Sequence, residues 1–185
     1  VATNQVWVDN NGNDNWTVLQ KQNPFSTTGE IQAETPVIND LFGTSLAQGL
    51  NNDGLIIGAT GYASGIGGVY AYNKLEDGST INGSTYAQQT ILSPDASLLF
   101  TGFGFSTDVG DTEWAIVGAP DSDSNKGYAS AIVRNSSNAT YSFYQHFNTG
   151  TNDADKFGYS VAISDDERWM YISAPADTKF MHLKK

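Results

Sequence analysis

Apolar residues occur along this chain in short runs, many of them alternating with polar residues. No window of helical length keeps the spacing of an amphipathic helix without an interruption by Gly or Pro. Clusters of Asn, Asp, Gly and Ser separate the runs, and these residue types form tight turns. The pattern predicts an all-β chain, with strands expected at 6–8, 16–19, 55–59, 68–72, 86–92, 114–119, 128–133, 141–147, 169–173 and 179–183.

The expected strands recur as a group. A Phe-Gly pair at 42–43 is echoed at 103–104 and 157–158. After each Phe, 15 or 16 residues lead to a triplet of small residues that ends an apolar run: Gly58-Ala59-Thr60, Gly118-Ala119-Pro120 and Ser173-Ala174-Pro175. Three copies in phase indicate a repeat protein, whereas a turn-rich β-sandwich would contain such motifs only by chance.

The repeat divides the chain into segments. Residues 42–92 and 103–147 form complete units, 148–185 form a partial unit, and 25–41 and 93–102 connect them. Residues 1–24 supply two strands that fit the outer half of a preceding unit. The connection before the first Phe-Gly pair is the longest of these links, and long connections within compact domains tend to be functional.

These motifs resemble the FG-GAP repeat, the unit of the β-propeller at the head of integrin α chains and in many bacterial, phage and other secreted or surface proteins. The likeness covers nearly the whole chain, and its cleanest copy is Phe103-Gly104 with Gly118-Ala119-Pro120. The resemblance implies four-stranded antiparallel blades around a central axis, about three in this chain, with Gly58 and Gly118 small because blades converge there. Since propellers close with about four to eight blades, we expect a segment of a longer propeller or a ring completed by other copies.

The resemblance also suggests calcium, because integrin-type blades often carry an Asp-rich loop between their first two strands. The matching positions, 51–54, 109–112 and 164–167, lack the alternating oxygen ligands that Ca²⁺ needs. The run Asp121–Gly127 begins like an EF-hand loop, but Lys126 stands where the turn glycine belongs and Ile132 occupies the twelfth position. We therefore interpret these segments as hairpin turns and a solvated loop and expect no cofactor or metal, with Ca²⁺ as the alternative.

The charge and composition of the chain make some classes of partner and some kinds of site unfavourable. Twenty acidic residues against nine basic ones give a net charge of −11, which disfavours nucleic acid and anionic membrane surfaces. No apolar stretch has the length of a membrane span, so we expect no membrane insertion. The chain has no cysteine, which excludes disulfides, thiolate metal sites and cysteine catalysis.

No catalytic residues are predicted. His146 and His182 fall in expected outer strands, and no G-x-S-x-G nucleophile motif is present. The pair Asp165 and Asp166 is interpreted as a turn rather than a glycosidase couple. The glycine-rich stretch 61–68 is not followed by Lys-Ser/Thr or by a predicted helix, as a phosphate loop would be. We expect a protein that is not an enzyme.

With no catalytic or metal site predicted, we expect the function to depend on surface residues that contact a partner. We expect the chain to be an extracellular, cell-surface or virion module that binds a protein, a glycan, neighbouring propeller segments or other subunits. The alternatives are an architectural part of a phage tail or adhesin and an auxiliary domain of a secreted hydrolase. The candidate contacts are the segment 22–41 with Phe25, Ile31 and Val37, and the aromatic residues Trp7, Trp16, Tyr141 and Tyr144. Asn15, Asn82, Asn135 and Asn138 head glycosylation sequons, which matter only in a source that glycosylates secreted proteins.

Overall fold

The computed structural model describes residues 5–9, 16–20, 31, 33, 35, 37–49, 54–75, 86–148 and 154–185. The chain divides into two compact units, residues 1–30 and 31–185. In the first unit, strand β1 (Gln5–Asp9) pairs antiparallel with β2 (Trp16–Gln20). The two strands expected in this segment therefore pair with each other.

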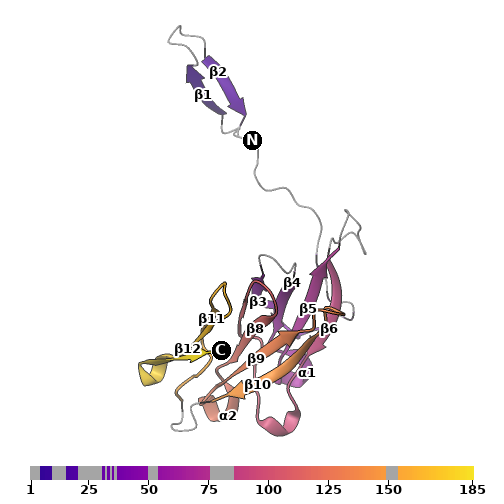
Figure 1. Ribbon diagram of the computed structural model, residues 1–185, viewed down its shortest axis with the longest axis vertical. Coiled ribbons are helices and arrows are strands. Elements are labelled where there is room, and N and C mark those ends of the chain that lie inside the picture. The colour runs from indigo at the N-terminus through magenta and orange to yellow at the C-terminus, as the bar shows by residue number, and fades with distance from the viewer. Residues whose placement is uncertain are drawn as a thin grey trace. The chain divides into compact units, whose positions relative to one another are not determined.

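The second unit contains three antiparallel sheets, which confirms the expected all-β class (Figure 1). In each sheet the strands pair in chain order. The first sheet contains β3 (Phe42–Gln48), β4 (Gly54–Ala59), β5 (Gly68–Lys74) and β6 (Tyr86–Leu92). The second contains β7 (Ser106–Val109), β8 (Trp114–Ala119), β9 (Tyr128–Arg134) and β10 (Tyr141–Phe147). The third contains β11 (Val161–Ile163), β12 (Trp169–Ala174) and β13 (Lys179–Lys184).

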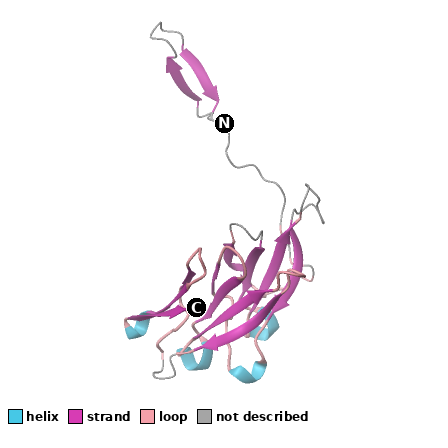
Figure 2. Ribbon diagram, viewed as in Figure 1, coloured by secondary structure: helices cyan, strands magenta, loops and turns pink. Residues whose placement is uncertain are grey.

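Short helical turns lie together at one end of the second unit (Figure 2). They are α1 (Tyr62–Gly65), η2 (Ala96–Leu98), α2 (Ser122–Asn125) and η3 (Pro175–Asp177). Both α1 and α2 contain residues with positive φ, so they are tight turns rather than regular helices. The sequence did not predict them, because three or four residues are too few to show a helical period.

Two hydrophobic clusters join the sheets. Between the first and second sheets, Ile56, Val69 and Ala71 pack with Phe103 and Val117. The second and third sheets are joined by a cluster of Ile116, Ala129, Phe157, Ile172 and Ala174. Strands β4 and β8 are therefore covered on both faces, which explains why their apolar residues form continuous runs rather than alternating.

The Phe-Gly pairs also connect successive sheets through the backbone. The Phe103 N–H donates to the Ile66 carbonyl at 2.9 Å, and the Phe157 N–H donates to the Lys126 carbonyl at 2.9 Å. Short parallel bridges join Gly67 to Phe103 and Gly127 to Phe157. The two junctions thus use the same contact, made by the first residue of the motif.

Two serines complete these junctions. Ser45 Oγ–H donates to the Gly104 carbonyl at 2.8 Å, and Ser106 Oγ–H donates to the Gly158 carbonyl at 2.9 Å. In both cases the acceptor is the glycine of the next Phe-Gly pair. The motif therefore links a strand of one sheet to the start of the following sheet.

Glycine is required near the ends of β4 and β8 because the backbone of the next Phe-Gly pair lies so close to these strands. A Cβ at Gly58 would lie 2.0 Å from the Gly104 carbonyl oxygen, and a Cβ at Gly118 would lie 2.0 Å from that of Gly158. Real Cβ atoms do not approach a backbone oxygen so closely. The immediate reason for these glycines is thus the backbone of the next sheet, a more specific cause than the expected convergence on an axis.

The opposite face of the first sheet is covered within its own unit. Tyr70 and Tyr72 fill much of this face, and Phe42 makes edge-on contacts with both rings at centroid distances of 5.1 and 6.4 Å. Ala33 is buried in the same cluster and Ile31 packs against it. The segment before the first Phe-Gly pair therefore contributes at least these two residues to the core, and Ile31 is not the free contact residue expected from the sequence.

Candidate functional site

The outer face of the third sheet is the strongest candidate site. Strands β12 and β13 pair Trp169 with Lys184, Tyr171 with His182, and Ser173 with Phe180. Side chains directly opposite each other in a pleated pair point to the same face. The face defined by these six residues is called the aromatic face below.

Equivalent positions in the other two sheets are buried. Tyr171 corresponds to Ile56 in β4 and to Ile116 in β8, both of which have no exposed surface. In contrast, 41% of Tyr171 and 68% of Phe180 is exposed. The third sheet therefore presents bulky aromatic side chains on the face that the first two sheets cover with their neighbour.

Ser173 gives a steric reason why the third sheet differs from the first two. It occupies the place of Gly58 and Gly118, where a Cβ would collide with the next sheet's backbone. Its hydroxyl also accepts the Ser160 N–H at 2.9 Å within the third sheet. A Phe-Gly pair consequently cannot approach the aromatic face as closely as it approaches the first two sheets.

The rings on the aromatic face contact one another. The His182 ring lies 5.9 Å from the Trp169 ring and 6.3 Å from the Phe180 ring, centroid to centroid. Lys184 Nζ lies 5.6 Å from the centre of the Trp169 ring, a cation–π geometry. A hollow of about 310 Å³ borders Phe180 and His182, with Phe157 and Ala174 among its lining residues. Phe157 and Ala174 belong to the cluster that faces the second sheet, so this hollow is not part of the aromatic face, which combines exposed aromatic area with a cation.

A second hollow lies between the second and third sheets, on the side of the third sheet opposite the aromatic face, where Met170 and Leu183 are among its lining residues. It has a volume of about 430 Å³, and Arg168, Lys184 and Lys185 line it together with Trp114 and Tyr144. Lys185 Nζ lies 4.9 Å from the centre of the Trp114 ring. The Trp114 and Tyr144 rings meet edge to face at 4.7 Å. This cavity, called the basic hollow below, brings three cations and the Glu167 carboxylate together with aromatic side chains.

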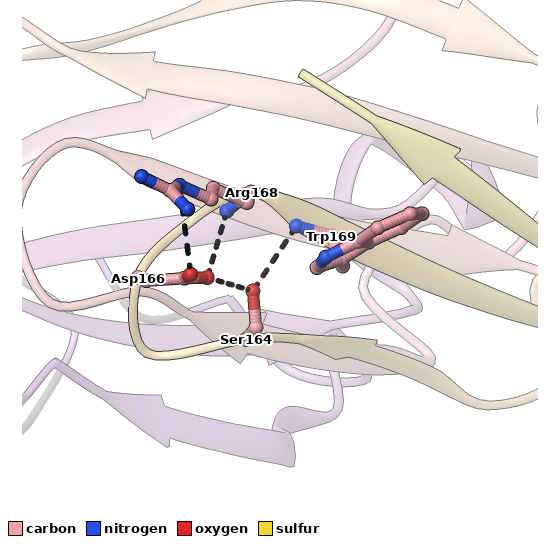
Figure 3. A network of polar contacts seen from close by, with 4 residues as sticks. All are labelled: Ser164, Asp166, Arg168 and Trp169. Atoms are coloured by element: carbon pink, nitrogen blue, oxygen red, sulfur yellow. Dashed lines mark hydrogen bonds and ion pairs between the residues drawn. The ribbon is translucent and has the colours of Figure 1, made fainter.

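The turn between β11 and β12 fixes the start of the aromatic face (Figure 3). Ser164 Oγ–H donates to Asp166 Oδ1 at 2.7 Å, and the same serine oxygen accepts the Trp169 N–H at 3.0 Å. Asp166 Oδ1 also accepts the Arg168 N–H at 3.1 Å, and its other oxygen lies 3.7 Å from Arg168 Nε. These bonds lower the pKa of Asp166 and hold Arg168 and Trp169 in place.

Glu167 faces the second sheet from the same turn. Its carboxylate is buried and accepts hydrogen bonds from the Thr112 hydroxyl and from the N–H groups of Thr112, Glu113 and Trp114. Burial raises the pKa of Glu167, but these donors outweigh it and the pKa is lowered. The carboxylate is therefore held in its ionised form, and it contributes a negative charge to the lining of the basic hollow.

Charge is unevenly distributed in the sequence around this site. Residues 165–185 hold four basic and four acidic residues, a net charge of zero, whereas the remaining residues hold five basic and sixteen acidic residues, a net charge of −11. Of the four cations, Arg168 lies near Asp166, and Lys179 is paired with Asp177 at 2.9 Å. Within the described residues, neither Lys184 nor Lys185 forms an ion pair with a carboxylate.

The segments considered for calcium form ordinary turns where they are described. No group of three or more His, Cys, Asp or Glu side chains suited to a metal is found among the described residues. Asp121 and Asp123 pair instead with Lys156 and Lys126, at 2.9 and 3.2 Å. In the 164–167 segment, Asp166 and Glu167 use their oxygens as hydrogen-bond acceptors within the protein, as described above.

The residues predicted to contact a partner differ in their exposure. Tyr144 is 64% exposed, as expected, but the expectation for Tyr141 is wrong, since only 3% of its surface is exposed. Its side chain belongs to the cluster between the first and second sheets, and burial raises the pKa of Tyr141 to about 12. Val37 is exposed. Phe25 and the side chains of Trp7 and Trp16 lie outside the described residues.

The histidines lie in strands, as predicted. His146 in β10 is half-buried between Phe100 and Phe143, and its Nδ1 lies 2.7 Å from Ser130 Oγ. Burial lowers the pKa of His146. His182 lies on the aromatic face, and Asp165 lies in the β11–β12 turn with Asp166.

No sequence motif marks Trp169, Tyr171, Phe180 or Lys184. One signal was available, because aligning the repeats places Tyr171 against two isoleucines and Phe180 against Val69 and Ala129. A large aromatic residue at a position that is small in the other copies indicates a face with a different neighbour. The candidate site is therefore indicated by the residues of the third sheet that differ from the repeat pattern.

No helix among the described residues is long and apolar enough to cross a membrane. A comparison with protein-family models and with curated protein sequences found no match to this chain.

Proposed function

We propose that this chain is a non-catalytic interaction module that binds a protein or a glycan through the aromatic face of its third sheet. The proposal rests on one observation: Tyr171 and Phe180 are exposed where the equivalent residues of the other sheets are buried. Monomeric proteins seldom expose contiguous aromatic area without a partner. Aromatic residues are also enriched in the centres of protein interfaces.

We further propose that the sheets are propeller blades of the FG-GAP type, in an extracellular, cell-surface or virion protein. The repeated Phe-Gly junctions and the sequential antiparallel strand order support this interpretation. Further blades, from a longer chain or from other subunits, would need a different junction at the third sheet because of Ser173.

A second candidate is an architectural role, in which another copy of the chain covers the aromatic face. The specific observation in its favour is that the Phe-Gly junction already joins sheets twice by one geometry. In that case the protein would self-associate in solution. A role as an auxiliary domain of a secreted hydrolase uses the same glycan-binding face and differs only in what lies beyond these residues.

The test compares the unaltered chain with a Tyr171→Ser/Phe180→Ser variant on a microarray of neutral and acidic glycans and by sedimentation. Both substituted side chains are exposed, so the fold should tolerate them. Leu46→Ser is the matched control, because Leu46 is an exposed apolar residue of the first sheet. Circular dichroism and thermal unfolding should be alike for all three proteins.

We expect the unaltered chain and Leu46→Ser to bind glycans or to self-associate, and the double variant to lose that property. Binding that survives in the double variant would overturn the assignment of the face. A chain that binds no glycan and sediments only as a monomer would overturn the glycan and self-association forms of the proposal together.

A further inference from the structure

We infer that the outer edge of β13 and the basic hollow beside it together bind one further β-strand, an extended segment of a partner polypeptide with large apolar side chains at alternate positions. The hollow lies on the side of the third sheet opposite the aromatic face. The inference therefore goes beyond the proposed function and does not depend on it.

The strand pairing of β13 differs from that of its equivalents. In the first two sheets, β5 and β9 pair with an inner strand on one side and with the outer strands β6 and β10 on the other. In the part of the third sheet that the structure describes, β13 pairs with β12 alone. The two complete sheets therefore show how a further strand would add to β13, and an extended segment added to a sheet edge is a common form of peptide recognition.

The register identifies the backbone groups at this edge. The Lys185 N–H donates to the Arg168 carbonyl, on the β12 side, at 3.0 Å. The N–H and C=O groups of successive residues in an antiparallel pair point alternately toward the partner strand and away from it. Those of Phe180, His182 and Lys184 therefore point away from β12, toward the place where the outer strand lies in the complete sheets.

The basic hollow lies where the inward side chains of a fourth strand would pack. In the second sheet, Tyr141 and Phe143 of β10 lie opposite two residues of β9 and pack in the cluster between the first and second sheets. The equivalents of those two β9 residues in β13 are Lys185 and Leu183, and both line the basic hollow. The hollow therefore corresponds to the space that two aromatic side chains fill between the first two sheets.

The lining of the hollow suits such side chains. Its apolar lining residues are Trp114, Tyr144, Phe147, Met170 and Leu183. Tyr144 is 64% exposed although it lies on the outer strand of the second sheet, next to the third. A strand added to β13 would cover this ring, and burial of apolar area favours the bound state.

The lysines of β13 argue against a second copy of the same strand at this edge. An antiparallel pair of β13 strands centred on or beside His182 would place Lys179 opposite Lys185 or Lys184. Like charges directly opposite each other destabilise a strand pair, and edge lysines prevent association of this kind. The ammonium groups of Lys184 and Lys185 lie over tryptophan rings on the two faces of the sheet, so they leave the edge open to a segment without lysines.

The test measures backbone hydrogen exchange by NMR, with a peptide that copies β10 and one flanking residue at each end as the probe. We expect the N–H groups of Phe180, His182 and Lys184 to exchange rapidly in the free chain and at least about tenfold more slowly with saturating peptide. The N–H groups of Met181 and Leu183 point toward β12 and should be protected in both states. A scrambled peptide of the same composition should protect none of the outer groups.

Paired variants separate the backbone contact from the side-chain contact. His182→Pro removes an outer N–H and should weaken peptide binding about tenfold, whereas His182→Ala keeps that N–H and should bind like the unaltered chain. Tyr144→Ser removes a wall of the hollow and should weaken binding about fivefold or more, whereas Tyr171→Ser, on the aromatic face, is the matched control. A peptide carrying Tyr141→Ser and Phe143→Ser should bind about tenfold more weakly. Thermal unfolding checks that each variant folds.

The results that would overturn this inference leave the proposed function untouched. Slow exchange of the Phe180, His182 and Lys184 N–H groups in the dilute free chain would show that the edge is already covered. Protection that rises with protein concentration would assign the edge to a second copy. No binding of the β10 peptide, equal binding of the scrambled peptide, or an equal loss in His182→Ala would also overturn it. The test of the aromatic face depends instead on Tyr171 and Phe180 side chains.

Discussion

The carboxylate of Glu167 is hydrogen-bonded to Thr112 through both of its oxygens. Oε2 accepts the Thr112 hydroxyl at 2.6 Å, and Oε1 accepts the Thr112 N–H at 2.7 Å. The N–H groups of Glu113 and Trp114 donate to Oε1 as well, at 2.7 and 3.1 Å. This contact ties the β11–β12 turn of the third sheet to the β7–β8 turn of the second sheet.

Replacing Glu167 with Gln should destabilise the protein. An amide has one oxygen in place of two, so its NH₂ group would face the donors that the carboxylate now satisfies. These donors are partly buried, and the loss of their charged acceptor should cost about 2 kcal/mol in the free energy of unfolding. Urea unfolding checks this value. Glu113→Gln is the control, since that side chain is exposed, and an equal loss in Glu113→Gln would contradict the role assigned to Glu167.

The same carboxylate makes stability depend on acid. Because the pKa of Glu167 is lowered in the folded protein, the unfolded chain binds the proton more readily. The stabilisation is complete above the ordinary value of 4.5 and is lost as the pH falls through the folded pKa. The difference in unfolding free energy between the unaltered chain and Glu167→Gln should therefore shrink below about pH 4.5. A difference that stays constant down to about pH 2.5 would contradict this mechanism.

Exchanging glycine and serine should have unequal effects at the two equivalent positions, Gly118 and Ser173. Gly118→Ser should unfold or strongly destabilise the protein, by about 3 kcal/mol or more, because its Cβ would meet the Gly158 carbonyl. The reverse change at the equivalent position, Ser173→Gly, should cost about 1 kcal/mol or less, the value of the hydrogen bond from Ser160. Thermal unfolding of the two variants measures the contrast. Similar losses at both positions would show that the third sheet is covered as the others are.

Much of the fold was predictable from residue patterns. The strands lie where runs such as 55–59 and 114–119 predicted them, and the three Phe-Gly pairs mark the starts of the three sheets. Strand patterns are informative because burial on one or both faces leaves a period that can be read directly. The turn residues between the strands added the boundaries.

The candidate site was less predictable. The exposure of Tyr171 depends on what covers the third sheet, and a single sequence does not state which apolar faces find a neighbour. Tyr141 shows the same limit in reverse, because an aromatic residue that begins an outer strand is buried by the adjoining sheet. The contact between Glu167 and Thr112 joins residues 55 positions apart and has no sequence motif.

The buried hydroxyl of Tyr141 should contribute nothing to stability. Its hydroxyl is buried and has no hydrogen-bond partner among the described residues. Tyr141→Phe removes that polar atom and keeps the ring, so we expect stability to be unchanged or to rise by about 1 kcal/mol. Tyr72→Phe is the matched control, because the Tyr72 hydroxyl donates to Gln88 Oε1 at 3.2 Å and its loss should cost about 1 kcal/mol. A clear loss of stability in Tyr141→Phe would reveal a partner for its hydroxyl.

His146 should make the fold sensitive to mild acid as well. Burial lowers the pKa of this imidazole below its ordinary value of 6.5, so the neutral form is the one that the folded protein favours. The unfolded chain takes up the proton first, and the stabilisation that is present above about pH 6.5 is lost as the pH falls toward the folded pKa. His146→Gln removes this titration while keeping a polar atom near Ser130 Oγ. Unfolding free energies measured between about pH 7.5 and 5.5 should decline in the unaltered chain more than in the variant. Parallel declines in the two proteins would assign the acid sensitivity to another group.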